Sequence, residues 1–309
     1  MNKITVVGAG RVGESTAQFI ASKDLCREIA LVDINEGAAS GAALDIQEDA
    51  PLFAFDTRLI GGSNPELMAD SDLIIITAGI PRKPGMSRSD VMEVNVRVTD
   101  EIVANTLKYA PNAMMLIVSN PVDILTYRAW KKTGWDRSRI FGQAGVLDST
   151  RMASFISLET GYSSLDINAM VLGGHGDSMV PMMRYTTISG IPVSNFLDQN
   201  KINDIVTRTR NGGAEILALR QNSSAFAAPA AAVSVMVDAI VNDRKRILPS
   251  VAILDNEYNC HDMAIGVPTV LGKNGLEQVI ELELNEQEQA DFNNSVAQVK
   301  KDLDILSKL

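Results

Sequence analysis

His175 is the residue of this 309-residue chain best suited to acid–base chemistry near neutral pH. It lies in the segment Gly173-Gly174-His175-Gly176-Asp177, directly after a short apolar run. Imidazole changes its charge near physiological pH, so histidine is the usual general acid or base of an enzyme. We interpret the flanking glycines as room for a ligand beside the ring, whereas the alternative is an ordinary hydrogen-bonded loop histidine. That plainer role is our interpretation of His261, the second of the two histidines.

Asp148 is the candidate partner of this histidine. A catalytic imidazole needs a carboxylate that fixes its tautomer and stabilises its protonated form. Asp148 lies in the segment Leu147-Asp148-Ser149-Thr150-Arg151, and Arg151 follows it by one helical turn, so both side chains can face the same side. The alternative for Asp148 is an acid favoured at a helix N-terminus by the helix dipole.

Two further polar segments follow apolar runs. The segment 80–88 carries Arg82 and Arg88 among two prolines and a glycine, which suggests a shaped loop that can close over an anionic ligand. The alternative is solvated charge. Asn120, in Ser119-Asn120-Pro121, follows the run Met114–Val118. In a parallel sheet such positions meet at the ligand-binding edge, so both segments are candidates for a site.

A glycine-rich turn, Gly8-Ala9-Gly10-Arg11-Val12-Gly13, follows the apolar run Ile4–Val7 and precedes a helical pattern. The three glycines allow a tight turn, a close approach of the backbone to a pyrophosphate and close packing of helix on strand. Asp33 follows Gly13 by 20 residues, at the end of the second run. A carboxylate there binds the ribose hydroxyls and repels a 2′-phosphate, which favours NAD over NADP. The alternative is a tight turn with a surface acid, and flavoproteins share this fingerprint.

The elements that position these residues alternate in type. Short apolar runs predict buried parallel strands, at Ile4–Val7, Ile29–Val32, Leu73–Thr77 and Met114–Val118. Helical patterns lie between or after them, at Val12–Ser22, Gly37–Asp49, Val91–Tyr109 and Ile124–Lys132. This order predicts an α/β fold with a doubly wound parallel (Rossmann) sheet.

The pattern changes in the second half of the chain. There we predict strands at Met170–Leu172 and Pro181–Ile188. We predict helices at 201–219 and 225–242, and a last helix with an apolar stripe from Phe292 to Leu306 that packs on the body of the protein. We therefore predict a Rossmann domain at 1–145 and an α+β catalytic domain at 146–309.

Composition excludes several classes of protein. The net charge of −10 argues against a nucleic-acid partner, because phosphate contacts need a basic face. We predict no membrane partner, since no stretch approaches the about 18 uninterrupted apolar residues of a spanning helix. Two distant cysteines, Cys26 and Cys260, form no disulfide framework, and with two histidines they do not supply a zinc site. We therefore expect a soluble cytoplasmic protein without a metal.

Taken together, these motifs resemble the lactate/malate dehydrogenase family along the whole chain. The matching segments, in the order and spacing of the family, are 8–13 with Asp33, the arginine loop 82–88, 119–121, 147–151 and 173–177. Within the family the chain is most similar to the malate dehydrogenase branch that is closer in sequence to the lactate dehydrogenases, since that branch shares Gly-Ala-Gly-x-Val-Gly.

The resemblance implies a role for each matching residue. His175 accepts the substrate proton and Asp148 orients it, while Arg151 binds the α-carboxylate of the substrate. Arg82 binds the distal carboxylate, Arg88 polarises the reacting carbonyl, and Asn120 holds the hydroxyl side. Less directly, Ser224 and Ala228 shape the pocket. The residues implied to bind NAD are Gly8, Ala9, Gly10, Arg11, Val12, Gly13, Asp33, Asn95, Val118, Ser119 and Asn120.

The function that the resemblance implies is reversible, NAD-dependent oxidation of (S)-malate to oxaloacetate, a step of the tricarboxylic acid cycle. The alternative is a lactate or other 2-hydroxyacid dehydrogenase, and Arg82 distinguishes the two because lactate dehydrogenases carry a neutral glutamine there. A non-catalytic dinucleotide-binding protein is a third hypothesis, which the His175–Asp148 pair disfavours. The family also implies a homo-oligomer, with a tetramer favoured over a dimer.

Overall fold

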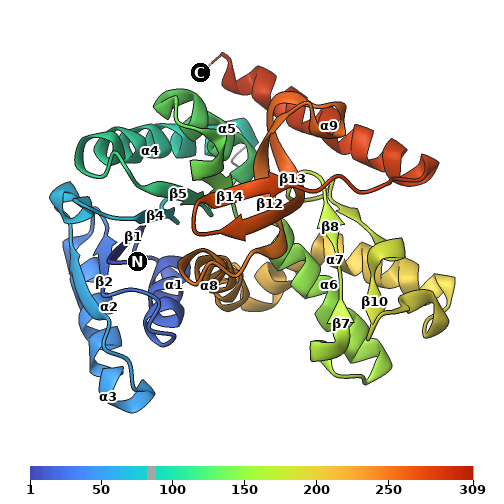
Figure 1. The fold of residues 1–309 in the computed structure, drawn as a ribbon, viewed down its shortest axis with the longest axis horizontal. Coiled ribbons are helices and arrows are strands. Elements are labelled where there is room, and N and C mark those ends of the chain that lie inside the picture. The colour runs from blue at the N-terminus through green and yellow to red at the C-terminus, as the bar shows by residue number, and fades with distance from the viewer. Residues whose placement is uncertain (82–87, 309) are drawn as a thin grey trace.

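The computed structural model describes residues 1–81 and 88–308, apart from the side chain of Arg88. Its centre is one nine-stranded sheet in the order β14-β13-β12-β6-β5-β4-β1-β2-β3 (Figure 1). The first six strands by sequence are parallel. Their bounds are β1 Lys3–Val7, β2 Glu28–Val32, β3 Arg58–Gly62, β4 Leu73–Ile76, β5 Met114–Ile117 and β6 Ile140–Gly142. This strand order is the doubly wound arrangement that the alternating pattern predicts.

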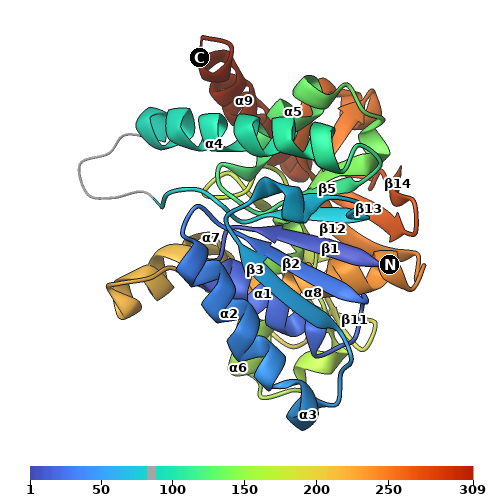
Figure 2. The ribbon, with the colours of Figure 1, turned by 90° about the vertical axis from the view of Figure 1, so that its left-hand side faces the viewer.

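Helices cover both faces of this sheet. Those of the first half are α1 Arg11–Ala21, α2 Glu36–Glu48, α3 Ala50–Phe53, α4 Arg88–Tyr109 and α5 Val122–Thr133. Those of the second half are α6 Gly145–Thr160, α7 Gln199–Arg220, α8 Ala227–Val241 and α9 Glu286–Leu306. Figure 2 shows α4 and α5 on one face, with α1 and α8 on the other. Short 3₁₀ helices occupy Pro65–Met68, Arg137–Arg139, Ser164–Asp166, Met183–Tyr185, Val193–Asn195 and Glu257–Asn259.

The second half contributes three antiparallel strands to the same sheet. They are β12 Arg246–Asp255, β13 His261–Gly272 and β14 Gly275–Val279, and β12 joins β6 through Val251 and Gly142. Smaller sheets are built from β7 Ile167–Asn168, β8 Val171–Leu172, β9 Val180–Pro181, β10 Thr187–Ile188 and β11 Ile191–Pro192. The sheet is therefore mixed, parallel in its first half and antiparallel at the edge that the second half adds.

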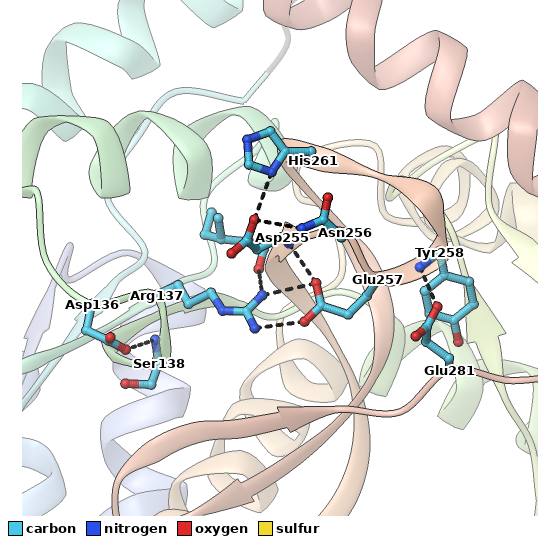
Figure 3. Close-up of polar contacts among 10 residues, drawn as sticks. Asp136, Arg137, Ser138, Asp255, Asn256, Glu257, Tyr258, His261 and Glu281 are labelled. Atoms are coloured by element: carbon cyan, nitrogen blue, oxygen red, sulfur yellow. Dashed lines mark hydrogen bonds and ion pairs between the residues drawn. The ribbon is translucent and has the colours of Figure 1, made fainter.

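Side chains at the turn of the β12–β13 hairpin tie it to the first half of the chain (Figure 3). Arg137 donates to Glu257, with Nη1 3.1 Å from Oε2, and to the carbonyl of Ile253. His261 has its Nδ1 2.8 Å from Oδ1 of Asp255, and both side chains are exposed. His261 is thus the hydrogen-bonded turn histidine that the sequence predicts.

Most predicted elements are confirmed, but one predicted strand is wrong, and five strands of the main sheet and the two short strands β7 and β11 were not predicted. The segment predicted as one strand at Pro181–Ile188 breaks at Met183–Tyr185, because β9 pairs with β8 whereas β10 pairs with β7 and β11. Among the predicted elements, the last helix does bury its apolar stripe, with Phe292 at 1% and Val299 at 4% exposed. The unpredicted strands of the main sheet are β3, β6, β12, β13 and β14.

Candidate functional site

His175 lies in the turn between β8 and β9, and its ring meets the first turn of α6. Its Nδ1 is 2.9 Å from Oδ2 of Asp148, whose side chain is only 2% exposed. A carboxylate has no proton to give, so Nδ1 donates and Nε2 is the nitrogen available to a ligand. Within the described residues Nε2 has no hydrogen-bond partner. The structure thus brings together the two residues that the sequence singled out for proton transfer.

The electrostatics of this turn favour the protonated imidazole. Burial by itself lowers the pKa of His175, because it penalises the charged form. The charge and hydrogen bond of Asp148, together with the charge of Asp123, outweigh burial and raise the pKa of His175 above its usual 6.5. A histidine with such a pKa can hold or release a proton near neutral pH, as a general acid or base must.

The glycines around His175 serve the backbone more than the ligand. Gly173 has φ +86°, and a Cβ there would lie 2.7 Å from Oγ of Ser295 on α9. Gly173 also exchanges backbone hydrogen bonds with Gly266 of β13, which fixes the base of the turn. Gly176 has φ +125° and open space around it. The interpretation that glycines on both sides clear room for a ligand is therefore wrong for Gly173 and Gly174, where a Cβ would meet Ser295 or Val299 of α9.

Arg151 lies one turn along α6 from Asp148, as the spacing predicts. Its Nη1 is 3.3 Å from Oδ1 of Asp148, and its side chain is 10% exposed. The stem of Arg151 passes directly over Gly212 of α7, where a Cβ would lie 2.3 Å from Cδ of Arg151. The position of this guanidinium therefore depends on the absence of a side chain at residue 212.

We expect Gly212→Ala to raise KM for the carboxylate substrate that the resemblance implies at least several-fold, because the added methyl group displaces Arg151 from its place beside Asp148. Gly213→Ala is the matched control, since a Cβ at Gly213 meets nothing within 4 Å. Steady-state kinetics on both variants, with Tm as a check of folding, measures the effect. An unchanged KM in a folded Gly212→Ala protein would show that Arg151 does not hold substrate.

The glycine-rich turn has the shape that a dinucleotide requires. Gly8 has φ +105°, and a Cβ at Gly13 would lie 1.8 Å from the carbonyl oxygen of Gly8. Gly10 has nothing within 4 Å of where its Cβ would be, and it begins α1 without a side-chain cap. The first N–H groups of α1 are therefore open to a phosphate, which the helix dipole attracts. These features fit NAD.

Asp33 lies at the end of β2, against the same turn. Its Oδ2 accepts the N–H of Ala9 at 2.7 Å and its Oδ1 accepts the N–H of Asn35 at 2.8 Å. The carboxylate thus stands where a ribose beyond the pyrophosphate would lie, and it also stabilises the turn itself. Val12, the remaining residue of the turn, packs against the main core.

Arg11 links the glycine-rich turn to the connection between α7 and α8. Its Nη1 is 3.5 Å from Oγ of Ser223, and its guanidinium lies 5.4 Å from the ring centre of Phe226. The same connection carries Ser224, and Ala228 lies in the first turn of α8. The structure therefore brings the predicted pocket residues of the second half close to the cofactor turn of the first.

Asn95 of α4 clamps two of the predicted loops together. It is 2% exposed, its Nδ2 donates to the carbonyl of Asn120 at 2.7 Å, and its Oδ1 accepts the N–H of Ile80 at 2.8 Å. Ser119 donates to the carbonyl of Ala78 at 2.6 Å, which adds a second tie. The amide of Asn95 is thus engaged with the protein backbone, so we expect it to act on the cofactor through the loops that it holds.

The structure describes only some of the remaining residues that the sequence predicts for the site. Val118 is buried, whereas Asn120, which follows β5, is exposed. Arg82 and the side chain of Arg88 lie outside the described residues, and their roles rest on the sequence. In the described part of the chain no helix is long and apolar enough to cross a membrane, and no group of three potential metal ligands forms.

Sequence reasoning missed two residues that bear on the site, Asp123 and Gly212. Asp123 lies in the first turn of α5, and its Oδ2 accepts the backbone N–H of His175 at 2.9 Å. Acids are common in first helical turns, so nothing in the sequence separated this one from others. Gly212 could have been noticed as a glycine within a helical pattern, which usually has a packing reason.

Fold and site together define a nicotinamide-dependent dehydrogenase: a dinucleotide cradle, and a histidine–aspartate pair next to a buried arginine. The model of the lactate/malate dehydrogenase NAD-binding domain matches residues 2–142, and the model of the lactate/malate dehydrogenase alpha/beta C-terminal domain matches residues 145–308. The chain belongs to the lactate/malate dehydrogenase family.

Curated relatives agree with this assignment. A malate dehydrogenase of Thioalkalivibrio sulfidiphilus is 64% identical, over 99% of this chain and 100% of its own length. A malate dehydrogenase of Nitrosococcus oceani is 61% identical, over 100% of this chain and 99% of its own length.

Solved structures of both branches of the family share the fold. The malate dehydrogenase of Salinibacter ruber is 42% identical with a TM-score of 0.95, covering 99% of this chain and 98% of its own. The lactate dehydrogenase of Cryptosporidium parvum, solved with lactic acid and NAD, is 35% identical with a TM-score of 0.96. The match covers 100% of this chain and 98% of the Cryptosporidium parvum chain. The fold alone therefore does not separate malate from lactate.

Proposed function

We propose that this enzyme interconverts (S)-malate and oxaloacetate with NAD. The observation that carries the proposal is the His175–Asp148 pair at 2.9 Å with Arg151 beside it, in a chain 64% identical to a malate dehydrogenase. NAD, when bound, supplies the redox chemistry by accepting a hydride from the hydroxy acid. The protein supplies position, charge and a proton acceptor.

In malate oxidation, Nε2 of His175 takes the hydroxyl proton of the substrate while Asp148 stabilises the imidazolium that forms. In the reverse direction the same nitrogen returns that proton to the oxygen of the ketone. Arg151 binds the carboxylate next to the reacting carbon through its planar guanidinium. Asn120 holds the hydroxyl side, Arg88 polarises the carbonyl and Arg82 binds the distal carboxylate.

NADH oxidation, followed at matched concentrations of oxaloacetate and pyruvate, tests this function directly. We expect rapid turnover with oxaloacetate and little with pyruvate. A preference for pyruvate would assign a lactate dehydrogenase, the alternative that the Cryptosporidium parvum neighbour keeps open. The absence of turnover with any 2-oxoacid, despite tight NADH binding, would indicate a non-catalytic dinucleotide-binding protein.

We expect Asp33→Ser to weaken NADH binding and to increase the relative use of NADPH. The substitution removes both an acceptor for the ribose hydroxyls and a charge that repels a 2′-phosphate. It also removes the bond to the N–H of Ala9, so part of the loss comes from a looser turn. The ratio of kcat/KM for NADH and NADPH is the measurement. Asp45→Ser, which removes an exposed acid of α2, is the control, and an equal ratio in both variants would place the ribose elsewhere.

The setting of the enzyme is part of the same proposal. Cys26 and Cys260 are both free and buried, which is consistent with a reducing compartment such as the cytoplasm. The reaction fits a step of the tricarboxylic acid cycle. Large apolar side chains exposed on α2 and α3 (Leu44, Leu52 and Phe53) support a homo-oligomer, for which we favour a tetramer over a dimer.

A further inference from the structure

Two buried carboxylates, from different helices, hold His175. Asp148 of α6 accepts from Nδ1 of the ring, and Asp123 of α5 accepts from the backbone N–H at 2.9 Å. Asp123 is 6% exposed and Asp148 is 2% exposed. The catalytic turn is therefore fixed at its backbone and at its ring by separate acids.

The hydrogen bond that Asp123 accepts from the backbone of His175 does not require a negative charge. An asparagine could accept the same N–H without the cost of burying a carboxylate. The second oxygen of Asp123, Oδ1, is buried and lacks a hydrogen-bond partner in the structure as described. No lysine or arginine of the described residues forms an ion pair with it. Its field is therefore only weakly compensated, and the charge of the His175 ring is the positive charge that acts on it.

We propose that Asp123 is a second positioning residue of the catalytic histidine, which fixes the turn by its hydrogen bond and favours the protonated ring by its charge. As a statement about catalysis, this inference rests on the proposed function. As a statement about the proton equilibrium of His175, it depends on the burial, charge and hydrogen bond of Asp123 and not on that function.

The charged groups around His175 define the expected effect. Asp148 and Arg151 face it from α6, Asp123 faces it from α5, and Asp177 lies on its own turn, while Ser295 and Val299, which meet the turn from α9, are uncharged. Burial lowers the pKa of His175, the two acids raise it and Arg151 lowers it, with a net increase. Burial raises the pKa of Asp123 to about 6, so its carboxylate is ionised over the neutral and alkaline range in which the ring loses its proton.

Removing this charge should move both pH profiles in the same direction. Oxaloacetate reduction needs protonated His175 and declines as pH rises through its pKa, whereas malate oxidation needs the neutral ring and increases there. A lower pKa of His175 therefore shifts the pH profiles of both reaction directions to lower pH. For Asp123→Asn we expect a shift of about half a pH unit or more, as a nearby buried charge implies.

The kinetic experiment compares the pH dependence of kcat/KM, in both directions, for the parent enzyme, Asp123→Asn and Asp72→Asn. Asp72 is the matched control, because its carboxylate also accepts the N–H of a residue distant in sequence, Asn2, at 2.6 Å. It differs in position, since it directly precedes β4, at the amino-terminal end of the parallel strands. NADH affinity, measured by fluorescence, should not change. A shift of the pH profiles in Asp123→Asn alone supports the proposal, and profiles that coincide with those of the parent enzyme overturn it.

A direct titration separates this inference from the proposed function. ¹³C-histidine NMR without substrate reports the ring of His175, and His261→Gln identifies its signal because the chain has two histidines. We expect the ring of His175 to lose its proton at lower pH in Asp123→Asn, or in Asp123→Ser if the first variant does not fold, than in the parent protein. An unchanged titration of the ring in a folded variant overturns the proposal. Failure of malate turnover with this shift of the titration intact would reject only the proposed function.

Discussion

Replacing His175 by asparagine should lower kcat for oxaloacetate reduction by about 10²–10⁴-fold, the usual contribution of a general acid or base. Asparagine cannot exchange a proton with the substrate oxygen near neutral pH, although it can fill much of the space of the ring. The binding of NADH should not change, because the glycine-rich turn and Asp33 lie on other elements. Stopped-flow absorbance of NADH gives the rate, and fluorescence titration gives the affinity.

His261→Asn is the control for this substitution. His261 is exposed and pairs with Asp255 at the end of a hairpin, so its replacement should leave kcat unchanged. If His175→Asn kept more than about a tenth of the parent kcat, another group would have to transfer the proton.

Arg82→Gln should lower kcat/KM for oxaloacetate by orders of magnitude and raise the ratio of pyruvate to oxaloacetate use. Both substrates share the carboxylate that Arg151 binds, but oxaloacetate carries a second one that needs its own cation, because an unpaired charge in a dry site is costly. With pyruvate in place the arginine would be the unpaired ion, so one residue attracts one substrate and rejects the other. Polar discrimination of this kind reaches about 10⁴–10⁵.

Steady-state kinetics with both 2-oxoacids measures this ratio. Lys83→Gln, which removes the adjacent cation of the same segment, is the control and should leave the ratio near that of the parent. A change of less than about tenfold for Arg82→Gln would mean that the distal carboxylate is bound elsewhere. Absolute activity with pyruvate can remain modest, because the pocket around Ser224 and Ala228 was not shaped for a methyl group.

Four strands of the parallel half (β1, β2, β4 and β5) and the glycine-rich turn could be predicted because both depend on local signals. An apolar run such as Leu73–Ile76, buried on both faces, differs in composition from the helices beside it. The turn after β1 needs glycine at fixed positions, and Asp33 has to follow at the end of the next strand. Such constraints act over short stretches of chain, so they can be recognised in the sequence without knowledge of the fold.

The long antiparallel strands β12, β13 and β14 of the second half could not be predicted in this way. β12 is buried against β6, a strand more than one hundred positions earlier, and its apolar run reads equally well as helix or strand. The break between β9 and β10 has a different origin, since β9 pairs with the nearby β8 whereas β10 pairs with β7 and β11. Pairing over long distances in sequence leaves no local pattern.

By itself, the sequence determined the types of residue that do the chemistry: a histidine, an acid one helical turn from an arginine, and a glycine-rich turn with an acid 20 residues on. Only the tertiary structure decided what surrounds them. It brings Asp123 of α5 to the backbone of His175 and places Gly212 of α7 beneath Arg151. Hydrogen bonds and close packing of this kind join elements that are distant in the chain. The proton affinity of the histidine and the position of the arginine therefore follow from the fold rather than from any motif.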